Sequence, residues 1–301
     1  MLEHFFSPKT VAVVGASREE GKVGHDLFKN LVRYGYKGKV YPVNPHADNI
    51  LGIKTYTALK EIPDKIDLAV IVVPAPYVSS TVDECIEKGI DSVIVISAGF
   101  KESGIDGAAR ERELYQKIKQ HSMRMLGPNC LGLIDTQSAL NASFAADMPA
   151  PGNIAFFSQS GALCTSILDW AVNECIGFSK FISMGNKTDI DEVDLIKAIE
   201  NDANTKVVLV YLEGVKNGTE FINAAKEITK KKPMIVVKSG GTTAGAKAAS
   251  SHTGTLAGSE NAFDAAFKQS GILRAKTIEE LFDYARIFSF QQLPRGPHIA
   301  L

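Results

Sequence analysis

The sequence has few cysteines, almost no net charge and no long apolar run. Only four cysteines occur in 301 residues, none in CxxC spacing, and the formal net charge is -1. Scattered cysteines beside apolar segments are typical of reduced thiols, which argues against a disulfide framework or a zinc site. A net charge this close to zero gives no overall positive electrostatic potential, which argues against nucleic acid or a membrane surface as the main partner. Without a membrane-length apolar run or a signal-peptide core in MLEHFFSPKT, we predict a cytoplasmic protein.

The first half of the chain alternates short apolar strands with helices. We expect strands at 10–14, 39–43, 68–73, 92–96 and 124–126, and helices at about 24–34, 77–88 and 108–121. This alternation predicts a parallel, doubly wound sheet with ligands bound beyond the carboxyl ends of its strands. Turn residues follow several of these ends: Gly15-Ala16-Ser17, Asn44-Pro45, Pro74-Ala75-Pro76, Ser97-Ala98-Gly99-Phe100 and Gly127-Pro128-Asn129.

The glycines after the first strand indicate which nucleotide fits there. A dinucleotide fingerprint needs G-x-G-x-x-G and an acidic residue at the end of the second strand. Here the glycines are Gly15, Gly21 and Gly24, and the second strand ends in Asn44, so NAD is disfavoured. A neutral strand end tolerates a ribose with a 3′-phosphate, and the helix near Gly24 can present N–H groups to phosphate. Coenzyme A meets both conditions, although other nucleotides are not excluded by them.

A second series of strands and helices follows a short proline-containing stretch at 146–152. We take that stretch as a domain boundary, with domains at 1–146 and 147–295. Residues 296–301 look like the first strand of a third, truncated α/β domain. The expected strands are 153–158, 178–183, 207–212, 234–237 and 272–275; the expected helices are 162–174, 191–201, 218–230, 259–270 and one that opens at Thr277.

Two strand ends in the second half carry groups suited to binding phosphate. The first strand leads directly into a helix, so the N–H groups of Ser160, Gly161 and Ala162 point toward an anion ahead of it. The third strand ends at Glu213 and brings a carboxylate to the same edge of the sheet. Taken singly, the first could be a plain strand-to-helix turn and the second a solvated loop glutamate.

A polar loop of small residues, KSGGTTAGAKAASSHTGTLAGSE at 238–260, carries His252. A long glycine-rich loop in a compact domain is typical of a lid, a binding loop or a carrier arm, although an ordinary surface loop is the alternative. Neutral imidazole is a competent nucleophile toward phosphoryl groups. A carboxylate such as Glu213 would fix its tautomer and stabilise the charge that develops. The combination predicts a phosphohistidine at His252.

Seven short motifs, which together span the chain, give it a resemblance to a known family. The sequence resembles the α part of nucleoside-diphosphate-forming acyl-CoA synthetases, most of all the ADP-forming acetyl-CoA synthetases, which are relatives of succinyl-CoA synthetase. The motifs are VVGAS (13–17), VVP (72–74), SAGF (97–100), GPNCLG (127–132), FSQSGAL (157–163), YLEG (211–214) and SHTGTLAG (251–258). The resemblance implies an N-terminal Rossmann-like CoA-binding domain followed by a flavodoxin-like, succinyl-CoA synthetase-like α/β domain.

The resemblance also implies roles for individual residues. Asn129 is expected near the acyl phosphate, His252 to carry the phosphoryl group and Glu213 to orient it. Phosphate is expected at Ser160, Gly161 and Ala162. Coenzyme A is expected at Gly15, Ala16, Ser17, Val73, Pro74, Ser97, Ala98 and Gly99.

In such enzymes acyl-CoA and phosphate give an acyl phosphate and coenzyme A, the acyl phosphate phosphorylates the histidine, and ADP with Mg²⁺ accepts the phosphoryl group. ADP or ATP and Mg²⁺ would bind an ATP-grasp β subunit or domain that is absent from this chain, and an oligomer is expected. Thr253 after the histidine points to the acetyl-type branch and short carboxylic acids. We therefore read the chain as an N-terminal fragment or a truncated subunit, with no metal site of its own.

Two other functions are compatible with the same scaffold. One is the body of a CoA-dependent protein lysine acetyltransferase, which need not keep His252 and Glu213. The other is a non-catalytic module that senses a nucleotide or coenzyme A, whose response would survive loss of His252. The presence of both side chains favours the synthetase.

Overall fold

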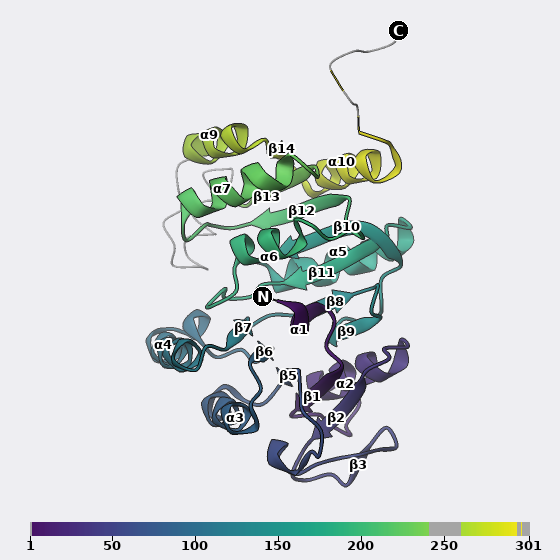
Figure 1. The fold of residues 1–301 in the computed structure, drawn as a ribbon, viewed down its shortest axis with the longest axis vertical. Helices are drawn as coiled ribbons and strands as arrows, with labels where there is room; N and C mark the ends of the chain where they lie inside the picture. Colours follow the sequence, from purple (N-terminus) through teal and green to yellow (C-terminus); the bar gives the residue numbers. More distant parts are fainter. Residues whose placement is uncertain (1, 241–259, 294–295, 297–301) are drawn as a thin grey trace.

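The computed structural model describes residues 2–240, 260–293 and 296 and contains two large sheets stacked along the long axis of the molecule, together with a small two-stranded sheet (Figure 1). Short apolar, β-branched runs form the strands, as expected for strands buried on both faces. The predicted strands are present to within two residues at each end and the predicted helices to within three. The sequence pattern therefore predicted most of the fold.

The first sheet is parallel and has the order β2-β1-β5-β6-β7. Its strands alternate their buried side chains between two faces: α3 and α4 cover one face, and α2 covers the other. Its elements are β1 (Thr10–Val14), α2 (Val23–Arg33), β2 (Lys39–Val43), β5 (Leu68–Ile71), α3 (Ala75–Lys88), β6 (Ser92–Val95), α4 (Ile105–Gln120) and β7 (Arg124–Leu126). Smaller elements are α1 (Glu3–Phe6), β3 (Asn49–Ile50), β4 (Ile53–Lys54) and two 3₁₀ turns, η1 (Leu59–Glu61) and η2 (Lys101–Ser103).

The second sheet has the order β14-β13-β12-β10-β11-β8-β9. Helices α6, α7 and α9 pack on one face of it, and α5 and α10 pack on the other. Its elements are β8 (Gly132–Asp135), β9 (Leu140–Ser143), β10 (Pro151–Ser158), α5 (Gly161–Asn173), β11 (Phe178–Ser183), α6 (Glu192–Ile199), β12 (Val207–Leu212), α7 (Gly218–Thr229), β13 (Met234–Lys238), α9 (Glu260–Ser270), β14 (Leu273–Ala275) and α10 (Ile278–Phe290).

Strands β8 and β9 were not predicted. They precede the boundary predicted at 146/147, yet they belong to the second sheet, where β8 pairs antiparallel with β11 and with β9. Each strand has only four residues, and β9 is half polar, so neither shows a clear strand period. The hydrogen bonding thus passes to the second sheet before residue 146. Of the residues predicted to open a third domain, only Gly296 lies within the described part of the chain.

A buried carboxylate joins the two halves. The side chain of Asp189, between β11 and α6, is 1% exposed, and its Oδ1 accepts a hydrogen bond from Lys119 Nζ at 2.9 Å. Its Oδ2 accepts from the backbone N–H of Met125 at 2.8 Å and from Arg124 Nε at 2.9 Å. Nearby, the Asn186 amide donates to Glu111 at 2.8 Å. The segment 184–191 of the second half is therefore held against α4 and β7 of the first.

We expect Asp189→Ala to lower the free energy of unfolding by about 3 kcal/mol, because the variant leaves the buried Met125 N–H and the partly buried Arg124 side chain without their acceptor. Urea denaturation measures the change. Asp283→Ala, on the exposed side of α10, is the control and should stay within about 0.5 kcal/mol of the parent protein. A loss no larger than that of the control would show that this carboxylate does not hold the two halves together.

Candidate functional site

The first sheet reverses its strand order between β1 and β5, which is where doubly wound sheets bind ligands. The turn after β1 begins at Gly15, whose φ is +93°. A Cβ added to Gly24, on the first turn of α2, would lie 2.1 Å from the carbonyl oxygen of Gly15. Glycine at both positions lets the first turn of α2 pack closely against the turn after β1. The N-terminus of the helix then faces the edge of the sheet.

Neighbouring loops are hydrogen-bonded to this turn and to each other. The side chain of Asn44, after β2, donates to the carbonyl oxygen of Ala16 at 2.7 Å. The Ser97 hydroxyl, after β6, donates to the carbonyl oxygen of Val73, after β5. The structure thus brings together, at one edge, the loops that carry the residues predicted to bind the cofactor: Gly15, Ala16, Ser17, Val73, Pro74, Ser97, Ala98 and Gly99.

The second sheet reverses its order between β10 and β12, and the predicted phosphate residues lie there. The N–H of Ser160 donates to Ser158 Oγ at 3.0 Å, and Ser160 Oγ accepts from the N–H of Leu163 at 3.3 Å. Helix α5 begins at Gly161, and its first turn carries no acidic side chain. This helix terminus therefore has the positive dipole end that an anion requires.

Glu213 follows β12 at the same edge. Burial and then the charge of Glu213 raise the pKa of the Tyr211 hydroxyl. Burial lowers the pKa of Lys238, at the end of β13, and the charge of Glu213 is among the influences that oppose this shift. His252 lies outside the described residues, so its pairing with Glu213 stays a prediction.

Asn129 lies between the two predicted sites. Its backbone N–H donates to the carbonyl oxygen of Ser97, at the first site, at 3.0 Å. Its side-chain amide lies 3.3 Å from Asn186 Oδ1, in the segment after β11. One residue of the first half therefore contacts a loop of the second half where the two carboxyl edges meet.

Two residues beside Glu213 were missed by sequence reasoning. Lys187 Nζ donates to Glu192 Oε2 at 2.8 Å and to the carbonyl oxygen of Gly214 at 2.7 Å. The Glu192 side chain is 0% exposed. In the sequence these two look like ordinary charged residues near a helix start, and only the fold places them against the loop after β12.

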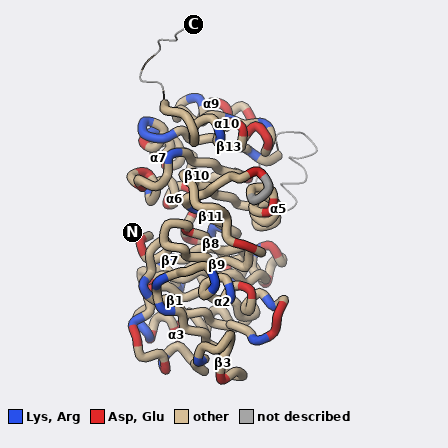
Figure 2. The backbone as a smooth tube through the Cα atoms, turned by 90° about the vertical axis from the view of Figure 1, so that its right-hand side faces the viewer, with Lys and Arg blue, Asp and Glu red and all other residues tan. Residues whose placement is uncertain are grey.

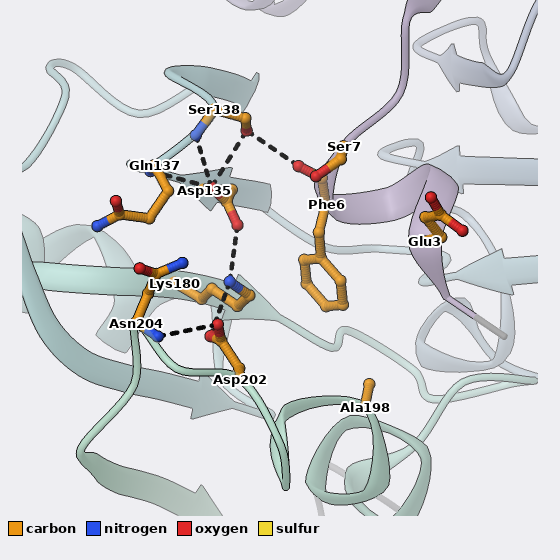
Figure 3. A pocket seen from close by; sticks show the side chains of 10 residues that line it. All are labelled: Glu3, Phe6, Ser7, Asp135, Gln137, Ser138, Lys180, Ala198, Asp202 and Asn204. Atoms are coloured by element: carbon orange, nitrogen blue, oxygen red, sulfur yellow. Dashed lines mark hydrogen bonds and ion pairs between the residues drawn. The ribbon is translucent and has the colours of Figure 1, made fainter.

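A cavity of about 400 Å³ lies at the other end of the second sheet and is lined by charged, polar and apolar side chains (Figure 3). Lys180, on β11, is held between Asp135 at 2.8 Å and Asp202 at 3.0 Å, and the ring of Phe6 covers its ammonium at 5.2 Å. Burial lowers the pKa of Lys180, but bonding to Asp135 and Asp202 raises it by more. Because the Lys180 ammonium is already paired with two carboxylates, we interpret these residues as a structural cluster.

Charged residues of both signs are interspersed along the backbone (Figure 2). Among the residues that the structure describes, no group of three or more His, Cys, Asp or Glu side chains could hold a metal ion. None of the helices described has the length and apolar character needed to cross a membrane.

Two family models match the chain. The CoA binding domain matches residues 9–136, and the succinyl-CoA ligase like flavodoxin domain matches residues 151–288. These matches define an α/β protein in which a CoA binding domain is followed by a succinyl-CoA ligase like flavodoxin domain. The chain belongs to the nucleoside-diphosphate-forming acyl-CoA synthetases, as the α part found in their ADP-forming acetate–CoA ligases.

Two relatives show how similar the chain is to proteins of this family. The chain is 48% identical to the acetate–CoA ligase [ADP-forming] I subunit alpha of Pyrococcus furiosus, covering 100% of this chain and 66% of that subunit. It is 46% identical to the 4-hydroxybutyrate–CoA ligase [ADP-forming] of Nitrosopumilus maritimus, covering 98% of this chain and 43% of the ligase.

A solved structure gives the same result. The dinucleotide forming acetyl-coenzyme A synthetase 1 of Ca. Korarchaeum cryptofilum, in complex with phosphate and ADP, has a TM-score of 0.95 and 45% identity. The match covers 98% of this chain and 64% of that one. The chain thus spans 66% or less of the length of each of these three proteins.

The Lys180 cluster predicts how stability depends on pH. Burial raises the pKa of Asp202, but hydrogen bonds from Thr205 and Lys180 lower it by more, so its net pKa lies below the usual value. Its contribution to stability is therefore complete above the pKa of the unfolded carboxyl, about 3.9, and is lost as the pH falls through the lower folded value.

We expect Asp202→Asn to be less stable than the parent protein at pH 7, with the difference shrinking as the pH falls below about 4, because the parent carboxyl then gains a proton. Denaturant titrations at several pH values measure this difference. Asp283→Asn, on an exposed helix face, is the control. A difference that does not change with pH would contradict the assignment.

Proposed function

We propose that the chain forms the α part of an ADP-forming acyl-CoA synthetase. The reaction interconverts acyl-CoA, phosphate and ADP with a carboxylic acid, coenzyme A and ATP. The proposal rests on one observation. Each sheet has a candidate ligand site at its carboxyl edge, and Asn129 contacts the loops of both edges. The two relatives described above support the same conclusion, because each is named as an ADP-forming acid–CoA ligase. We propose acetate-type acids as substrates.

Coenzyme A fits the first edge. Gly24 packs closely against Gly15, which holds the start of α2 at this edge. The backbone N–H groups at the start of the helix can then donate to phosphate oxygens. Asn44 is neutral, and its amide is already bonded to the turn, so the second strand ends without the carboxylate that NAD would need. We propose that the eight residues gathered there bind coenzyme A.

Phosphate fits the second edge, at Ser160, Gly161 and Ala162. There a phosphate oxygen attacks the thioester carbonyl carbon, the C–S bond breaks, and coenzyme A leaves as a thiolate that takes up a proton. In the next step a nitrogen of His252 attacks the phosphorus of the acyl phosphate, the P–O bond to the acyl group breaks, and the carboxylate leaves. Asn129 holds the acyl phosphate, and Glu213 orients the imidazole and stabilises its positive charge.

The second half-reaction needs a further part. The phosphoryl group on His252 passes to ADP, which with Mg²⁺ binds an ATP-grasp subunit or domain. The length of the Nitrosopumilus maritimus ligase supports a further part, because the chain covers only 43% of it. We also propose the domains 1–146 and 147–295, with β8 and β9 of the first contributing strands to the sheet of the second. A third domain that opens at 296–301 and an oligomeric assembly complete the proposal.

The first test of the proposal is a calorimetric titration. We expect saturable binding of coenzyme A and no binding of NAD. Gly24→Ala should weaken coenzyme A binding by at least about tenfold, because its methyl group would collide with the Gly15 carbonyl. Gly218→Ala, where a Cβ meets nothing within 4 Å, is the control. Binding of NAD without coenzyme A would contradict the assignment of this edge.

The second test is phosphorylation of His252. Incubation with acetyl-CoA and radiolabelled phosphate should give acid-labile, base-stable label, which His252→Ala abolishes and His121→Ala leaves in place. Glu213→Gln should slow labelling by about 10²–10⁴-fold, the range for a group that assists proton transfer or orients the base. Acid-stable label, or label that persists in His252→Ala, would overturn the phosphohistidine.

A further inference from the structure

The side chain of Gln159 connects the two loops of the proposed phosphate site. Gln159 lies in the turn between β10 and α5, immediately before Ser160. Its Oε1 accepts hydrogen bonds from the backbone N–H groups of Glu213, at 2.7 Å, and Gly214, at 3.1 Å. Its Nε2 donates to the carbonyl oxygen of Gly214 at 2.9 Å. One amide thus binds both backbone polar groups of the residue after Glu213.

This amide is itself held in one orientation. Its Nε2 lies 3.4 Å from Glu192 Oε2, the oxygen that also accepts from Lys187 Nζ. Because Oε1 faces two donors and Nε2 faces two acceptors, a flipped amide would lose all of these contacts. The other oxygen of Glu192 is buried and has no hydrogen-bond partner in the described structure, so this carboxylate depends on Lys187 and Gln159.

We propose that Gln159 is a positioning residue that fixes Glu213 relative to the phosphate-binding turn. This proposal rests on the proposed function and adds a residue to it. Residues 213–217 lie between β12 and α7 and have no helix or strand of their own to hold them. Gln159 directly precedes Ser160, and its side chain binds this segment. The hydrogen bonds therefore keep a constant separation between the anion and the carboxylate that orients His252.

Lys187 makes the proposal testable without loss of the fold. It donates to the Gly214 carbonyl independently of Gln159, so the loop keeps one anchor when the amide is removed. Gln159→Met keeps the length of the side chain and removes its hydrogen bonds. Gln137→Met, an exposed glutamine at the opposite end of the sheet, is the matched control.

The experiment compares rates of His252 labelling from acetyl-CoA and radiolabelled phosphate, and measures coenzyme A affinity in parallel. Gln159→Met should slow labelling by about 100-fold, the usual effect of a displacement of about 1 Å at a reacting centre. Its coenzyme A affinity should stay within about twofold, since that site lies on the other sheet. Gln137→Met should label at the parent rate.

Combination with Glu213→Gln separates positioning from a general structural effect. If Gln159 acts through Glu213, the double variant should label about as slowly as Glu213→Gln alone. Losses that multiply, or a Gln159→Met rate equal to that of the control, would overturn the proposal while leaving the phosphohistidine intact. A parent protein that takes up no label would instead contradict the proposed function. Gln159→Asn, too short to make the same three bonds, repeats the comparison and is judged by the same outcomes.

Discussion

The arrangement of the molecule depends on the buried carboxylate of Asp189. It accepts hydrogen bonds from Lys119, Arg124 and the backbone of Met125, all from the first half of the chain. A carboxylate with so little exposure is stable only when its charge is paired and its oxygens are hydrogen-bonded. The segment after β11 therefore cannot leave the first sheet without a large cost in free energy. The same segment is held along β7 and the turn after it by backbone hydrogen bonds from Thr188 to Gly127 and from Ile190 to Met125.

The contact between the two halves also includes Asn129 and Asn186, whose side chains are hydrogen-bonded between the two candidate ligand sites. A thioester carried by the first half and a phosphate held by the second must come together for the proposed chemistry, and a fixed junction supplies that proximity. The same edge contains the Gln159 amide and the Lys187–Glu192 pair, which hold the segment after β12. Rigid supports of this kind let a loop carry a catalytic carboxylate with little freedom to move.

The sequence predicted most strands because each is a short apolar run with turn residues at its end, and it predicted the helices because they alternate with those strands. It also predicted that the loops carrying the candidate residues lie together at one edge of each sheet, since parallel strands bring their carboxyl ends together. That these edges bind ligands stays a prediction. It did not predict β8 and β9, whose burial comes from pairing with β11 rather than from a pattern of their own. Nor did it predict Lys187 and Glu192, because a buried ion pair depends on contacts that no spacing rule shows. His252 lies outside the described residues, so that assignment still rests on the sequence.

If this chain joins phosphate to the acyl group of a thioester, as we propose, the acyl phosphate can be trapped. The chain is incubated with acetyl-CoA and phosphate, without ADP, and released thiol and hydroxylamine-trapped acyl group are both measured. The account predicts phosphate-dependent thiol release, matched by an equal amount of acyl hydroxamate above that formed without protein. Thiol release without phosphate, or release without the matching hydroxamate, would show hydrolysis or another transfer and would contradict the account.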